Sequence, residues 1–218
     1  MYTKAANNGH AGAQGRLGDA YENGDLDLLT DKKEALKWYR QAAEGCDDDA
    51  QTRLAEAYED GELDLAVNLK EALMWYRKAA KGGDDSAQRR LAEACEFGQL
   101  GLEIDIHVAL DWYRKAATGG DEDAQRRLAE ACEFSHLGMA IDLQLALMWY
   151  QKAAEGGDDD ASASSFLRTH LFEARYAPLA DVLLCTAREK EEEEGDGDFS
   201  DGDDTTLGDN SKHYVAIV

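Results

Sequence analysis

The sequence is poor in basic residues, has one proline and contains no long apolar run. Its 23 Lys and Arg residues face 46 Asp and Glu residues, which gives a formal net charge of −23. A surface of this sign repels phosphate, so we expect no nucleic-acid partner. No apolar stretch approaches the ~20 residues that span a bilayer, so we expect no membrane insertion. The first residues do not resemble a signal peptide.

Paired cysteines and metal-ligand spacings are also missing. The four cysteines, Cys46, Cys95, Cys132 and Cys185, form no CxxC pair. They share no ligand spacing with the five histidines, so we expect reduced thiols, no metal and no cofactor. No phosphate-binding glycine loop, nucleophile elbow or Cys/His dyad appears. We therefore predict a protein that is not an enzyme, in a cytoplasmic or nuclear setting, unless residues upstream of Met1 carry a targeting signal.

A period of 37 residues organises most of the chain. Ala-Gln recurs at positions 13, 50, 87 and 124, and Trp-Tyr recurs at positions 38, 75, 112 and 149. Within each unit, apolar residues follow the i, i+4, i+7 spacing of two amphipathic helices. The second helix is expected to begin after an N-cap and to end at a glycine that adopts the left-handed conformation. The N-caps are Asp31, Asn68, Asp105 and Asp142, the glycines are Gly45, Gly82, Gly119 and Gly156, and the turn leucines expected in the core are Leu26, Leu63, Leu100 and Leu137.

The fold class that follows is all-α, a solenoid of helical hairpins. The Trp-Tyr pairs stand at one helical position in every unit, so we interpret them as packing between repeats rather than as a ligand cage. Shifting the sequence by 37 residues aligns Tyr2 with Tyr39, so the chain begins inside a second helix. The expected divisions are a partial repeat at 1–12, repeats at 13–49, 50–86, 87–123 and 124–160, capping helices at 161–194 and a disordered acidic tail at 195–218.

The repeat resembles the Sel-1-like repeat, a relative of the tetratricopeptide repeat. The second unit carries the pattern most fully, with Leu54, Tyr58, Gly61, Trp75 and Tyr76 in register. Departures from the pattern are Cys46, Cys95, Cys132 and Ser135. The resemblance implies that the first helices line a concave surface, and that the protein acts as an adaptor or scaffold for other proteins.

Helical-wheel geometry places rows of charged residues of the first helices away from the core. They form a candidate groove for an extended or helical peptide that bears basic residues. The alternative is a solvated face of i,i+3 Arg–Glu pairs. Phe97 and Phe134 lie beside these rows, either as binding anchors or folded under the adjoining turn. The candidate partner-binding residues are Arg53, Glu56, Glu59, Arg89, Arg90, Glu93, Glu96, Phe97, Arg126, Arg127, Glu130, Glu133 and Phe134.

Three functions remain open from the sequence. The leading prediction is a protein-interaction adaptor that holds partner proteins or peptides on the concave face. The start within a second helix raises a second hypothesis, the regulatory repeat region of a longer multidomain enzyme. The acidic residues of the tail raise a third, a chaperone for basic proteins.

Overall fold

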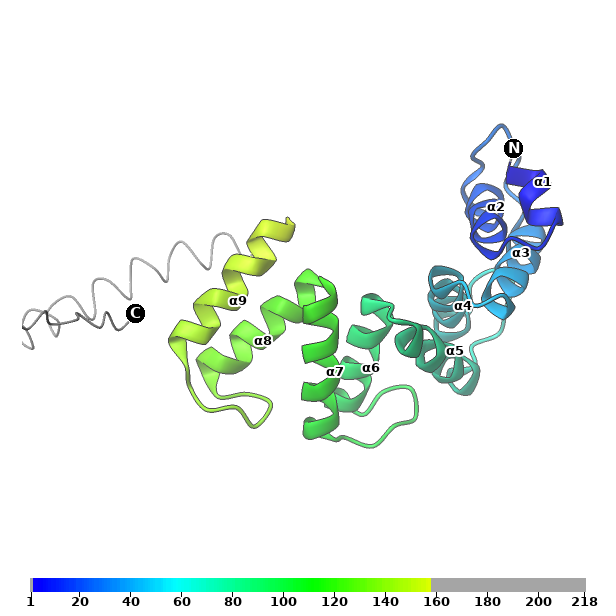
Figure 1. The fold of residues 1–218 in the computed structure, drawn as a ribbon. Helices are drawn as coiled ribbons and strands as arrows, with labels where there is room; N and C mark the ends of the chain where they lie inside the picture. The colour runs from blue at the N-terminus through cyan, green and yellow to red at the C-terminus, as the bar shows by residue number, and fades with distance from the viewer. Residues whose placement is uncertain (1, 158–218) are drawn as a thin grey trace, which may run out of the picture. The chain divides into compact units, whose positions relative to one another are not determined.

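A computed structural model describes residues 2–157, which contain nine helices and no strand (Figure 1). The expected capping helices at 161–194 and the tail at 195–218 lie outside the described residues. Within the described part of the chain, no helix is both long and apolar enough to cross a membrane. The helices are α1 (Tyr2–Asn7), α2 (Ala11–Asn23), α3 (Lys32–Glu44), α4 (Asp48–Asp60), α5 (Leu69–Gly82), α6 (Asp85–Phe97), α7 (Ile106–Gly119), α8 (Glu122–Phe134) and α9 (Leu143–Gly156).

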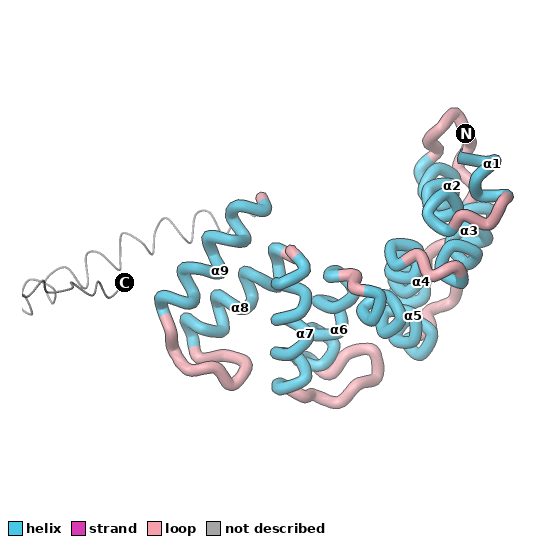
Figure 2. Tube along the Cα trace, viewed as in Figure 1, coloured by secondary structure: helices cyan, strands magenta, loops and turns pink. Residues whose placement is uncertain are grey.

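Each helix packs on its neighbours in sequence, as an α/α solenoid requires. The pairs α2–α3, α4–α5, α6–α7 and α8–α9 form hairpins, and each second helix then packs on the first helix of the next hairpin (Figure 2). Contacts between neighbours in sequence dominate, so a continuous core is built by stacking hairpins. The predicted all-α solenoid is confirmed.

The beginnings of the second helices are set by side chains that the sequence identifies. The Asp31 carboxylate accepts hydrogen bonds from the backbone N–H groups of Lys33 and Glu34, at 2.9 and 3.1 Å. Asn68, Asp105 and Asp142 cap α5, α7 and α9 in the same way. These bonds satisfy donors that have no partner inside the helix. All four predicted N-caps are confirmed.

The ends of the second helices differ from the prediction by one residue. The left-handed position belongs to the second residue of each closing pair, which is Cys46, Gly83, Gly120 or Gly157. Gly45 has an ordinary φ of −79°. The first glycine is needed for a different reason, because a Cβ on Gly45 would lie 2.9 Å from Cβ of Ala11 at the start of α2, the first helix of the same hairpin. Its role is therefore close helix approach.

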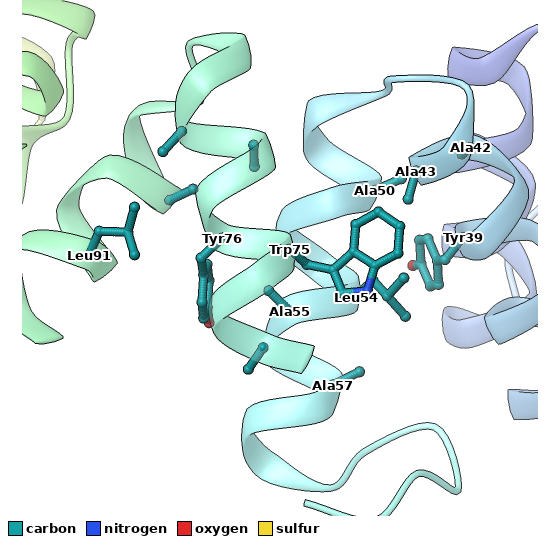
Figure 3. Close-up of a cluster of buried hydrophobic side chains, with 14 of the residues drawn as sticks. Tyr39, Ala42, Ala43, Ala50, Leu54, Ala55, Ala57, Trp75, Tyr76 and Leu91 are labelled. Carbon is teal, nitrogen blue, oxygen red and sulfur yellow. The ribbon is translucent and has the colours of Figure 1, made fainter. Parts of the chain in front are cut away.

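The core consists of alanines, leucines and the Trp-Tyr pairs. Tyr39, Tyr76, Tyr113 and Tyr150 are all about 2% exposed. Figure 3 shows Trp75 on the side of α5 toward Leu54 and Tyr76 directed toward Leu91, all within one buried cluster. The pair thus packs against the first helix of its own hairpin and against the hairpin after it. The interpretation of Trp-Tyr as packing between repeats is confirmed.

Three of the four turn leucines are buried as predicted, but Leu26 is not. Leu63, Leu100 and Leu137 are 1%, 5% and 6% exposed, whereas Leu26 is 56% exposed. Leu63 shares its cluster with Ala35, near the start of the preceding second helix α3. For Leu26, the equivalent of α3 is α1, which begins at Tyr2, the counterpart of Tyr39. Residues 2–157 therefore contain no counterpart of Ala35 beside Leu26.

Candidate partner-binding face

The predicted groove residues all lie on the first helices α4, α6 and α8, on the surface that we call the first-helix face. It comprises the thirteen candidate residues named above together with their counterparts on α2, Arg16, Asp19 and Glu22. Many of its charged residues form hydrogen bonds or ion pairs with the neighbouring hairpin, so they also hold the repeats together. Two sets of contacts between repeats and one set within helices account for most of their partners.

The first set joins a tyrosine, a glutamate and an arginine from three consecutive helices. The Tyr76 hydroxyl on α5 donates to Glu59 Oε2 on α4 at 2.9 Å, and Arg90 Nε on α6 donates to the same oxygen at 3.1 Å. Because the pattern repeats along the array, we call it the Tyr–Glu–Arg ladder. Its other members are Tyr39–Glu22–Arg53 and Tyr113–Glu96–Arg127, and Tyr150 donates to Glu133 at 3.2 Å.

The ladder corrects the prediction that Glu59 and Glu96 face away from the core. Glu96 is only 9% exposed, and the side chain of Glu59 is 18% exposed. The cause is the buried tyrosine hydroxyl, which needs a hydrogen-bond partner and holds the carboxylate inward. These two glutamates therefore stabilise the stack of repeats, and a partner could recruit them only by breaking the ladder.

Electrostatics within the ladder favour the charged arginine and the neutral tyrosine. Burial acts to raise the pKa of Glu22, but hydrogen bonds from Arg53 and Tyr39 outweigh it, so that this pKa is lowered. Burial and then the Glu59 charge raise the pKa of Tyr76 well above its ordinary value. The hydrogen bond to Glu22 raises the pKa of Arg53. Each group is thus held in one protonation state at neutral pH.

The second set links a first helix to the N-cap of the next first helix. Thr52 Oγ1 donates to Asp84 at 3.0 Å, and Arg89 Nε donates to Asp121 at 3.0 Å. Asp84 and Asp121 also accept from the backbone N–H groups of Ala87 and Ala124, so each carboxylate caps a helix and binds the preceding repeat. Arg89 is therefore a structural residue as well as a surface one.

Pairs within the helices confirm part of the alternative of a solvated, ion-paired face. Glu93 lies 2.7 Å from Arg89, and Glu130 lies 3.2 Å from Arg126 and 3.3 Å from Arg127. Glu56 lies 3.6 Å from Arg53. Pairs of this kind contribute a few tenths of a kcal/mol each. These three glutamates remain accessible at modest cost.

Phe97 and Phe134 lie at equivalent ends of α6 and α8, and both are exposed. Their exposed fractions are 57% and 54%, so the alternative that they fold under the turn is wrong. The Phe134 ring lies 5.9 Å from the His136 ring. Phe97 also borders a hollow of about 270 Å³ between the third and fourth hairpins, whose other lining residues are Arg89, Glu93, Tyr113, Asp123, Arg126 and Arg127.

Charge is distributed unevenly along the first-helix face. On α4, Arg53 stands against Glu56, Glu59 and Asp60, and Glu62 follows in the turn. On α6 and α8, two arginines balance two glutamates at the same positions, and phenylalanine replaces Asp60. The face is therefore acidic at its second hairpin and neutral with exposed aromatic rings at its third and fourth.

The described residues hold no cluster suited to a metal ion, and their two buried thiols are poor nucleophiles. In residues 2–157, no group of three or more His, Cys, Asp or Glu side chains is placed to bind a metal. Burial raises the pKa of the Cys95 and Cys132 thiols, which disfavours the nucleophilic thiolate. The two cysteines fill the core position that Tyr58 occupies on α4.

Comparison with known protein families finds repeats that agree with the 37-residue period of the sequence. The Sel1 repeat model matches residues 11–45, 48–84, 85–121 and 122–158, which together exceed half of the chain. The chain belongs to the Sel1 repeat family. Sel1 repeat proteins are generally non-catalytic scaffolds for protein–protein interaction. The resemblance inferred from the sequence is confirmed.

Two solved structures show how far the similarity extends. A Sel1 repeat protein from Oxalobacter formigenes is 35% identical, with a TM-score of 0.66, over 75% of this chain and 64% of that protein. The protective antigen c5321 of uropathogenic Escherichia coli, which displays an SLR fold, is 32% identical, with a TM-score of 0.65, over 73% of this chain and 33% of that protein. This Sel1 repeat chain thus spans less than two thirds of either protein. No curated protein sequence matches it significantly.

Neither the tyrosines nor the aspartate N-caps were predicted from the sequence as parts of the face. A signal was present, since a buried tyrosine hydroxyl demands a partner and a glutamate stands 17 residues before each one. Asp84 and Asp121 are the N-caps of α6 and α8. Their second bond, to the preceding repeat, depends on how the hairpins stack.

Proposed function

We propose that this Sel1 repeat array is an adaptor that holds an extended or helical segment of a partner protein on its first-helix face. The segment contacts Phe97 and Phe134 through apolar side chains at the third and fourth hairpins. It contacts Glu56 and Asp60 through basic side chains at the second hairpin. The observation that carries the proposal is the pair of exposed phenylalanines at equivalent positions, of which Phe97 borders a hollow.

Exposed aromatic rings in register are a good basis for affinity. Burying a phenylalanine side chain contributes about 1.5–3 kcal/mol, and aromatic residues are enriched among the residues that dominate interface energies. The equivalent residues of the first two hairpins are Asn23 and Asp60, so the aromatic character is local. A segment that covers both rings would fix its register on the array.

The carboxylates supply orientation rather than most of the affinity. Burial raises the pKa of Glu56, with Arg53 acting in the opposite direction, and a basic side chain placed beside it would favour the charged form. Complementary charge mainly increases the association rate and the specificity of an interface. We therefore expect a partner segment with basic residues at one end and apolar residues at the other.

The proposal is tested with a random 12-residue peptide library selected against the full chain. Selected peptides should combine Lys or Arg with at least two large apolar residues. Their affinity should fall about tenfold or more in the variant Phe97→Ala/Phe134→Ala, since each ring is expected to contribute about 1 kcal/mol or more.

The matched control is Ile104→Ala/Ile141→Ala. These two residues are also 37 positions apart in the same hairpins and are both 64% exposed, but they lie in the turns. Affinity should change by no more than about twofold in this control. The proposal would be contradicted if the selected peptides bound the phenylalanine variant as tightly as the isoleucine control, or if they contained no basic residue.

A further inference from the structure

A hollow of about 390 Å³ lies between the second helices α7 and α9, and its described lining residues are distinct from those of the first-helix face. Its two sides differ in chemistry, because α7 contributes basic side chains whereas α8, α9 and the turn between them contribute apolar ones. We call it the α7–α9 pocket. Among its lining residues are Arg114 and Lys115 of α7, Leu128 of α8, Met139 of the turn, and Leu145 and Trp149 of α9.

The apolar wall of the pocket is particular to the fourth hairpin. The positions equivalent to Leu145 on α3 and α5 hold Glu34 and Glu71, so a carboxylate stands there in the first two hairpins. Trp149 is half-buried, whereas its equivalent Trp75 is only 8% exposed. An apolar ligand can therefore cover indole surface on α9, and it meets a leucine there instead of a charge.

The Arg114 side chain on the opposite wall lacks the partner that its equivalent on α3 has. Arg40 Nη2 donates to the Tyr58 hydroxyl of α4 at 3.3 Å. The residue that corresponds to Tyr58 for Arg114 is Cys132 on α8, and a thiol is a weak hydrogen-bond acceptor. Replacement of the tyrosine by cysteine thus leaves an exposed guanidinium beside the pocket without that hydrogen bond.

No resident counter-charge has to be displaced for an anion to bind here. Among residues 2–157, no carboxylate lies within ion-pair distance of Arg114 or Lys115. The Lys115 ammonium lies 3.9 Å from the centre of the Trp112 ring, which holds it against α7. Helices α7 and α9 together carry three basic and two acidic residues, so they do not share the strong negative charge of the chain.

We propose that the α7–α9 pocket binds a large apolar side chain of a partner protein, in a segment whose neighbouring residues are acidic. The apolar side chain covers Leu145 and Trp149, and the carboxylates beside it pair with Arg114 and Lys115. Consecutive Cα atoms lie about 3.8 Å apart, so residues next to the anchor can reach these cations while the anchor stays in the pocket. The inference does not rest on the partner proposed for the first-helix face, whose charge is of the opposite sign.

The experiment measures the binding of fluorescein-labelled peptides to the full chain by fluorescence anisotropy. The probes are Gly-Asp-Glu-Phe-Glu-Asp-Gly and the two peptides in which leucine or alanine replaces the central phenylalanine. The phenylalanine or leucine peptide should bind at least about tenfold more tightly than the alanine peptide, because only a large side chain fills the pocket.

Two variants of the pocket test its two walls. Leu145→Glu places on α9 the residue type of α3 and α5, and it should weaken binding of the better peptide at least about tenfold, because the new carboxylate repels the peptide. Arg114→Gln/Lys115→Gln should weaken it at least about fivefold. Glutamine is compatible with the fold at the first of these positions, since Gln151 is the equivalent residue of α9.

The matched control is Arg77→Gln/Lys78→Gln, which removes the equivalent pair of charges from α5. Lys78 lies 3.8 Å from the centre of the Trp75 ring, so this control also removes an equivalent contact with a tryptophan. Affinity should stay within about twofold, because these residues lie one repeat away from the pocket.

Four outcomes would overturn the inference. The first is that neither the phenylalanine nor the leucine peptide binds. The second is equal affinity for the phenylalanine and alanine peptides, which would show attraction by charge alone. The third is an equal loss of affinity in the α5 control and in the α7 variant. The fourth is loss of binding in Phe97→Ala/Phe134→Ala, which would place the peptide on the first-helix face.

Discussion

Arg90 Nε on α6 donates a hydrogen bond to Glu59 Oε2 on α4 at 3.1 Å, across the boundary between the second and third hairpins. The same oxygen accepts from the Tyr76 hydroxyl at 2.9 Å. Both charged side chains are 18% exposed, so the pair is largely withdrawn from solvent. The stacking of Sel1 repeats in this chain thus depends on a charged bond in addition to apolar packing.

Breaking this bond should destabilise the array more than breaking an exposed pair. Glu59→Gln leaves the partly buried Arg90 guanidinium with only the Glu93 carboxylate, at 3.8 Å, as a counter-charge, so we expect the free energy of unfolding to fall by about 2 kcal/mol. A double-mutant cycle with Arg90→Gln, measured by urea unfolding, should give a coupling energy of about 1–2 kcal/mol. The exposed pair Glu34–Lys37 should give no more than about 0.5 kcal/mol in the same cycle. Equal coupling energies for the two pairs would contradict the structural role of the ladder.

The turn leucines provide a second test, because equivalent residues differ in burial. Leu63→Ala should lower the free energy of unfolding by about 2–4 kcal/mol, since it removes a buried side chain and leaves a cavity. Leu26→Ala should change it by no more than about 0.5 kcal/mol, because that side chain is exposed. Urea unfolding of the two variants measures both values. A loss at Leu26 comparable to that at Leu63 would show that Leu26 is buried in solution.

Features that depend on one helix were predictable from the sequence. The N-caps Asp31 and Asp105 were predictable because a capping side chain bonds to backbone within its own helix. Burial of the Trp-Tyr pairs was predictable because an amphipathic stripe that repeats every 37 residues has only one consistent way to pack.

Features that depend on the stacking of hairpins were not predictable in the same way. A helical wheel for α4 alone directs Glu59 toward solvent, and only the position of Arg90 and Tyr76 on neighbouring helices turns it inward. Leu26 matches Leu63 in sequence pattern, but the burial of such a leucine depends on the second helix of the preceding repeat. The exposure of Phe97 was left open by periodicity, because the residue stands at the last position of α6.

Replacing Cys46, the second residue of the closing pair of α3, by glycine should stabilise the protein. Cys46 adopts a φ of +64°, a conformation that strains residues with a Cβ, and the equivalent positions hold Gly83, Gly120 and Gly157. Cys46→Gly should raise the free energy of unfolding by about 0.5–1 kcal/mol. Cys46→Ala removes the thiol but keeps the strain, so it should leave stability within about 0.5 kcal/mol. A gain in both variants would assign the effect to the thiol instead of the backbone.

The buried tyrosines should make the array sensitive to alkali. Burial, with a smaller effect of the Glu130 charge, raises the pKa of Tyr150 to about 12, and the pKa values of Tyr39, Tyr76 and Tyr113 are raised as well. In the unfolded chain, tyrosine ionises near pH 10. The folded state therefore keeps a proton that the unfolded state loses, so the contribution of Tyr150 to stability is fully present below pH 10 and is lost as the pH rises toward 12.

Urea unfolding between pH 8 and 11.5 should show the free energy of unfolding falling above pH 10, by about 1.4 kcal/mol per pH unit for each such group. Tyr150→Phe removes one such group, so it should reduce this slope by about 1.4 kcal/mol per pH unit and leave the pH dependence of stability below pH 9 unchanged. A slope identical to that of the unaltered chain would mean that the Tyr150 hydroxyl is accessible to solvent.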